Sequence, residues 1–137
     1  FDESLFAHME EIDYHWKCLL NGYDVYVQPK STLYHKGGQT LAYGSYKKIY
    51  LNHRNSMILF LTTNQEISFL KILKRLTLEK IAILFYIIKL DFKGAFAIVH
   101  ALLWLLFNII YLFKRKKTVK KIIRNYHPIS TVLIKNY

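Results

Sequence analysis

The sequence contains a single cysteine in 137 residues, so no disulfide can form within the chain. One unpaired thiol, Cys18, in a lysine-rich chain favours a reducing compartment. The chain opens on Phe1-Asp2-Glu3 rather than on methionine, and no signal peptide is recognisable. We therefore expect a fragment of a longer protein, with enough residues for one modest domain.

Acidic residues are scarce and unevenly placed. Residues 1–70 hold 6 Lys+Arg and 7 Asp+Glu, whereas residues 71–137 hold 14 and 2. The basic half also contains the apolar runs 81–88 and 94–113. Lysines pair with lipid phosphates while apolar faces enter the acyl region, whereas nucleic-acid-binding tails are usually basic without such runs. The composition therefore predicts an anionic membrane surface as partner and no nucleic acid.

The pattern of the first 64 residues predicts mixed helices and strands. Apolar spacing predicts helices over 10–21 and 46–61, the first ended by Gly22 as its C′ residue. Residues 23–28 and 31–35 are rich in tyrosine, valine and leucine, which predicts two short strands.

After Asn64 the sequence becomes amphipathic and basic. Residues 94–113 then carry no formal charge over 20 positions, and a helix of that length covers about 30 Å, the thickness of a hydrocarbon core. We expect residues 65–117 to form amphipathic and apolar membrane-associated helices, and residues 118–137 to form a basic tail.

Three carboxylates, Glu10, Glu11 and Asp13, lie at the start of the predicted helix 10–21. A solvated helix face is the ordinary interpretation. However, Asp13 falls beside the apolar stripe that contains Trp16, and the helix N-terminus stabilises negative charge. Carboxylates held there would suit a general base or a metal shell, and the residues alone leave both interpretations open.

The order of motifs resembles family 2 glycosyltransferases, the inverting GT-A enzymes, and most of all their rhamnosyltransferase-type members. A Phe-Asp-Glu opening, an aromatic-rich stretch, Glu10-Glu11-Ile12-Asp13, a Gly-Tyr, a Pro and a Tyr-His followed by two glycines appear in sequence. Residues 46–61 resemble the family's Tyr-Tyr-x-x-Arg-Asn segment. The resemblance covers residues 1–61, and it rests on the order of motifs that are individually weak.

The resemblance implies roles for individual residues. Glu11 stands where the family places its general base, usually an aspartate, with Asp13 as the alternative base and Glu10 as the supporting acid. Further implied roles are acceptor or donor contacts for Trp16 and Lys17, donor-diphosphate contacts for Arg54 and Asn55, and a late metal ligand for His35. Ordinary structural roles remain open for these residues, core packing for Trp16 among them.

The sequence lacks the family's metal-binding Asp-x-Asp and any Gly-rich phosphate loop. The resemblance implies a divalent metal, Mg or Mn, bound largely by residues missing from this chain. The expected fold is therefore α/β: residues 1–64 form the C-terminal, acceptor-side part of a GT-A (Rossmann-like) catalytic domain, followed by the helices of 65–117. This part alone is expected to be inactive.

The expected function is transfer of a sugar from a nucleotide-sugar donor to a glycan or lipid-linked acceptor, in cell-surface polysaccharide or glycolipid synthesis. Nucleotide sugars are cytosolic, so the resemblance places residues 1–61 inside the cell. The positive-inside rule also places residues 114–124 inside, and a single span cannot leave both ends on the same side. A helix or hairpin in the cytoplasmic interface of the membrane is favoured, then a re-entrant hairpin, with burial against another domain still open. The alternative function is a non-catalytic membrane-binding or scaffold segment.

Overall fold

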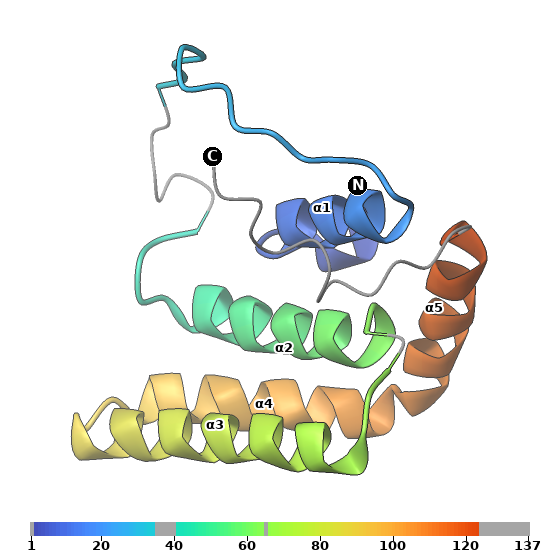
Figure 1. The fold of residues 1–137 in the computed structure, drawn as a ribbon. Coiled ribbons are helices and arrows are strands. Elements are labelled where there is room, and N and C mark those ends of the chain that lie inside the picture. Colours follow the sequence, from blue (N-terminus) through green and yellow to red (C-terminus); the bar gives the residue numbers. More distant parts are fainter. Residues whose placement is uncertain (1, 35–40, 65, 124–137) are drawn as a thin grey trace.

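The structure, a computed structural model, describes residues 2–34, 41–64 and 66–123. Its elements are a short 3-10 helix, η1 (Glu3–Leu5), and the helices α1 (Glu10–Leu20), α2 (Tyr46–Thr62), α3 (Phe69–Ile88), α4 (Phe92–Phe107) and α5 (Ile109–Ile122). Figure 1 shows α2, α3 and α4 running along one another, with α1 beyond α2 and α5 standing across their end.

The expected α/β architecture is wrong, because the three described ranges contain helices and no strand. Residues 22–34, which include the predicted strand 23–28 and most of 31–35, are irregular and largely exposed. Tyrosine and valine favour strands because their side chains pack well against those of a neighbouring strand. Without a neighbouring strand, this preference does not produce a strand. Within the described residues no such neighbour lies beside this segment, and Val27 remains 88% exposed.

Both predicted helices of the first half are confirmed. α1 ends in a Schellman motif, in which the N–H of Tyr23 bonds the Cys18 carbonyl and the N–H of Gly22 bonds the Leu19 carbonyl, each at 3.0 Å. Gly22 has φ +80°, the left-handed conformation predicted for the C′ residue. At the start of α2, the Ser45 hydroxyl accepts a hydrogen bond from the Lys48 N–H and caps the helix.

Helix α4 packs against α2, α3 and α5. Its buried face is made of small side chains with one isoleucine and one leucine, and it includes Ala97 and Ile98, which contact Ile49 of α2. At Gly94 an added Cβ would lie 2.3 Å from the ring of Tyr86 on α3. The small residues therefore let α3 and α4 approach closely as an antiparallel hairpin (Figure 1).

The predicted helical character of residues 65–117 is confirmed, but the uncharged run 94–113 is not one helix. α4 ends at Phe107, α5 begins at Ile109, and the two are bent by 75° at Asn108. Among the described residues no single helix has the length and apolar character to cross a membrane, although α4 and α5 taken together do.

Asn55 of α2 anchors the segment before α1. Its side chain is fully buried, and its amide nitrogen donates to the carbonyls of Leu5, Ala7 and His8 at 2.7, 2.8 and 3.0 Å. This segment includes positive φ values at Phe6, His8 and Met9, which cost energy in residues other than glycine. The amide therefore stabilises the backbone conformation that leads into α1.

We expect Asn55→Ala to lower the free energy of unfolding by about 2–3 kcal/mol, since buried carbonyls would lose their donor. Urea denaturation of the chain measures this change. Asn52→Ala, one turn earlier at an exposed position of the same helix, is the matched control and should cost less than about 0.5–1 kcal/mol. Equal losses for the two variants would contradict the anchoring role.

Candidate functional site

The acid cluster occupies the first turn of α1, as predicted. Its N-cap residue, Met9, is in the left-handed conformation, and no side chain caps the helix. Glu11 is exposed, Glu10 is partly buried, and Asp13 is only 1% exposed. The three carboxylates therefore lie in three different environments, although they are close in sequence.

Asp13 is held by side chains from three other positions. Its Oδ1 accepts from Nη2 of Arg115 at 2.9 Å and from the Thr63 hydroxyl at 3.4 Å. Its Oδ2 accepts from Nζ of Lys17, one turn along α1, at 2.5 Å. Both oxygens of this buried carboxylate thus have charged partners, which offsets the desolvation that burial imposes.

Arg115 is the centre of this cluster and comes from α5. Its Nε donates to Oδ2 of Asp2 at 3.0 Å, Nη2 binds Asp13, and Nη1 donates to the Thr62 hydroxyl. Arg115 is 6% exposed, and its guanidinium reaches from α5 to residues of the N-terminal segment, α1 and α2. A planar group with five N–H donors suits such divergent partners.

Asp2 is partly buried, and burial alone would raise its pKa. The hydrogen bonds from Ser4 and the positive charge of Arg115 outweigh burial, so the pKa of the Asp2 carboxyl lies below its ordinary value of 3.8. Asp2 therefore remains ionised beside Arg115 in the folded chain at neutral pH.

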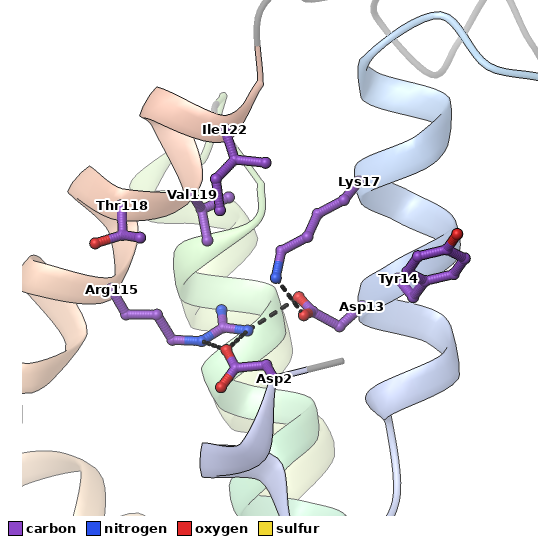
Figure 2. Close-up of a pocket in the computed structure, with 8 residues that line it drawn as sticks. All are labelled: Asp2, Asp13, Tyr14, Lys17, Arg115, Thr118, Val119 and Ile122. Atoms are coloured by element: carbon purple, nitrogen blue, oxygen red, sulfur yellow. Dashed lines mark hydrogen bonds and ion pairs between the residues drawn. The ribbon is translucent and has the colours of Figure 1, made fainter.

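A pocket of about 350 Å³ lies between α1 and α5, next to these ion pairs. Figure 2 shows Lys17 and Asp13 facing Arg115 and Asp2 across it. Its lining residues are Asp2, Asp13, Tyr14, Lys17, Arg115, Thr118, Val119 and Ile122. The charges in the pocket are paired with one another, and Glu11 does not line it.

The structure therefore separates the residues that the resemblance groups together. Asp13 and Lys17 lie in the pocket as an ion pair, whereas Glu11 is exposed outside it. Trp16 is half-buried on α1. Oε2 of Glu10 is buried without a hydrogen-bond partner among the described residues.

Arg54 and Asn55, the predicted diphosphate contacts, both bind the segment before α1. The Arg54 Nε donates to the Asn55 side-chain oxygen at 2.9 Å, and its Nη2 donates to the Ser4 carbonyl at 3.1 Å. The guanidinium also lies over the rings of Tyr50 and Trp104, at 5.6 and 5.2 Å from their centroids. Both side chains thus have partners within the protein.

His35, the predicted metal ligand, lies outside the described residues, so this role stays a prediction. In the described part of the chain no three histidine, cysteine, aspartate or glutamate side chains are placed to hold a metal ion. Asp2 and Asp13 share one partner, because both carboxylates form ion pairs with Arg115. The expected Mg or Mn, bound largely by residues missing from this chain, therefore stays a prediction.

Asp2 and Arg115 are members of the cluster that sequence reasoning missed. The sequence places Arg115 only within the basic stretch 114–124. Yet Leu112, Arg115, Val119 and Ile123 follow steps of three, four and four residues, the spacing of one helix face. An arginine within an apolar stripe is the signal that could have indicated a buried ion pair.

Comparisons with protein-family profiles, curated proteins and solved structures found no match to this chain.

We expect Arg115→Met to lower the free energy of unfolding by about 3–5 kcal/mol, because it leaves buried carboxylates without their cation. Chemical denaturation measures the loss, and Lys117→Met at an exposed site on α5 is the control. Adding Asp13→Asn to Arg115→Met should recover part of the loss. Strictly additive costs would contradict a coupled ion pair.

Stability should also depend on pH through Asp2. Because its folded pKa is lowered, its contribution is complete above the unfolded value near 3.8 and is lost as pH falls through the folded value. Asp2→Asn should therefore lower stability at pH 7, and its difference from wild type should shrink toward pH 3. Denaturation across pH 3–7 tests this. In an Arg115→Met background, Asp2→Asn should change the slope of the unfolding free energy against pH less than in wild type.

Proposed function

We propose that this chain is part of an inverting glycosyltransferase and that Glu11 supplies the general base. The proposal rests on the resemblance of residues 1–61 to family 2 glycosyltransferases. The observation that favours it most is the exposed position of Glu11 at the start of α1, beside a buried and fully paired Asp13. Glu11 is thus available to a substrate on a helix that Arg115 of α5 and Thr63 bind through Asp13.

In the proposed reaction, the Glu11 carboxylate takes the proton from an acceptor hydroxyl. The hydroxyl oxygen forms a bond to the anomeric carbon of the donor sugar as the bond from that carbon to the diphosphate breaks. The nucleoside diphosphate leaves with the electron pair, and attack from the opposite face inverts the anomeric configuration. The helix N-terminus stabilises the charged form of the base before the reaction.

The structure bears on the choice between the two candidate bases. To accept a proton, Asp13 would have to give up hydrogen bonds from Arg115 and Lys17 inside the protein. Breaking a buried pair of this kind costs several kcal/mol. Glu11 carries no such cost, so the geometry favours Glu11 as the base and a structural role for Asp13.

The donor nucleotide and its metal would bind elsewhere in a longer polypeptide, since the described residues do not fit a metal site. A polysaccharide or glycolipid precursor remains the proposed acceptor, and the cytoplasmic face of the membrane the proposed location.

The alternative is a non-catalytic membrane-binding or scaffold segment. It is favoured by the apolar residues that α3 and α4 expose. The two proposals differ in one outcome, because only the enzyme requires the Glu11 carboxylate.

In the polypeptide that joins this chain to its nucleotide-sugar-binding part, Glu11→Gln should reduce sugar transfer by roughly 10²–10⁴-fold. The amide keeps the shape of the side chain but cannot accept a proton at neutral pH. Glu11→Asp should retain more activity, because it keeps the carboxylate, and Glu10→Gln should matter less. Turnover with a labelled donor measures these effects.

Glu3→Gln, an exposed carboxylate on η1, is the matched control and should keep normal turnover. Donor affinity and unfolding midpoint should be unchanged in Glu11→Gln. If Asp13→Asn abolishes transfer while its fold is intact and Glu11→Gln stays active, the assignment of the base is wrong. Normal turnover in both variants would refute the glycosyltransferase mechanism.

A further inference from the structure

Helix α3 buries one charged residue, Glu79, while many of its apolar residues are exposed. Glu79, which is fully buried, has its Oε2 at 2.6 Å from Nδ1 of His53 on α2. Its Oε1 forms an ion pair at 2.6 Å with Arg75, which also donates to the Ser56 hydroxyl. The inner side of α3 therefore combines this ion cluster with the apolar residues Leu76, Ala82, Ile83 and Tyr86, which pack against the core.

The opposite side of α3 carries what we call the outer stripe: Leu70, Leu73, Thr77, Ile81, Leu84 and Ile88. These positions follow steps of three or four residues, so they form one line along the helix. All are exposed, with Leu70 and Ile81 at 58% and Ile88 at 72%. A continuous apolar line of this length marks a surface that contacts something other than water.

The charges around the outer stripe indicate what it contacts. Lys71 follows Leu70 and Lys80 precedes Ile81, so each lies about 100° from the stripe, on opposite sides. Lys74 lies beside it, and the one acidic residue of α3, Glu79, is buried on the other side. Apolar side chains bordered by exposed lysines match a bilayer whose headgroups are anionic, because lysine stems follow the apolar surface while their amines reach the phosphates.

The hairpin partner, α4, exposes further large apolar residues, including Phe92 and Phe96, and Lys89 and Lys93 lie exposed near the turn. The Lys89 amine lies over the Phe85 ring, 4.5 Å from its centroid. The turn between the helices thus repeats the combination of aromatic residues and cations seen along α3.

We propose that the outer stripe of α3 docks on an anionic lipid bilayer, with the helix lying in the plane of the interface. The buried His53–Glu79–Arg75 cluster would then hold α3 to α2 with its apolar side turned outward. This surface uses no residue of the proposed active site, so it is independent of the glycosyltransferase proposal.

The test is co-flotation of the chain with vesicles of phosphatidylcholine containing phosphatidylserine, compared with phosphatidylcholine alone. We expect binding to the anionic vesicles that weakens with salt. Ile81→Glu should reduce the partition coefficient at least tenfold. Leu33→Glu, the same kind of change at another exposed apolar position, 84% exposed, is the matched control and should bind normally.

A second pair of variants separates α3 from the basic end of the chain. Replacing Lys71, Lys74 and Lys80 together by glutamine should weaken binding on the order of 100-fold, at about fivefold per lysine. Replacing Lys117, Lys120 and Lys121 of α5 removes the same charge and should cost clearly less. Circular dichroism would verify that each variant is folded.

Three outcomes would overturn the proposal. Unchanged binding of Ile81→Glu, or equal losses for the two lysine triples, would remove α3 as the docking face. Protection of Leu84 from hydroxyl-radical modification before vesicles are added would mean that another part of the polypeptide covers the stripe. Conversion of an oligomer to a monomer by Ile81→Glu, without an effect on vesicle binding, would assign the face to a second copy of the chain.

Discussion

The Arg115 guanidinium is the interaction on which the arrangement of the chain depends. It binds Asp2, Asp13 and Thr62, and so brings together the N-terminal segment, the helix with the candidate base, the end of α2, and α5. A buried ion cluster is stable only when every charge is paired, since each unpaired ion retains its desolvation cost. The cluster therefore stabilises one relative position of these elements and opposes small displacements.

Contacts from α2 hold the segment before α1, and they thereby position the acidic residues at the start of α1. Asn55 holds the carbonyls of residues 5–8, while Arg54 stacks over aromatic rings and binds the Ser4 carbonyl. Together they support an uncapped helix start that leaves Glu11 exposed. Arg54 and Asn55, which the family resemblance assigns to substrate binding, therefore contact the segment that leads into α1 and its proposed base, Glu11.

The chain uses its charges in two opposite ways. Ion pairs in the interior, at Arg115 and at Glu79, join helices that also pack through apolar clusters. Many leucine, isoleucine and phenylalanine side chains of α3 and α4 are left on the surface beside lysines. An enzyme that modifies lipid-linked acceptors would be held near them by such a surface. The proposed bilayer docking of α3 would therefore support the proposed glycosyltransferase function.

The sequence by itself determined the helices, because the spacing of apolar residues, the Schellman glycine Gly22 and the cap Ser45 act over a few neighbouring positions. It also placed the carboxylates at the first turn of α1. The absence of a strand in residues 22–34, the bend at Asn108, and the separation of Asp13 from Glu11 were decided by tertiary structure. Strands need a neighbour, and Arg115 forms its ion pairs with partners 113 and 102 residues away, so no local pattern specifies the neighbour or the partners.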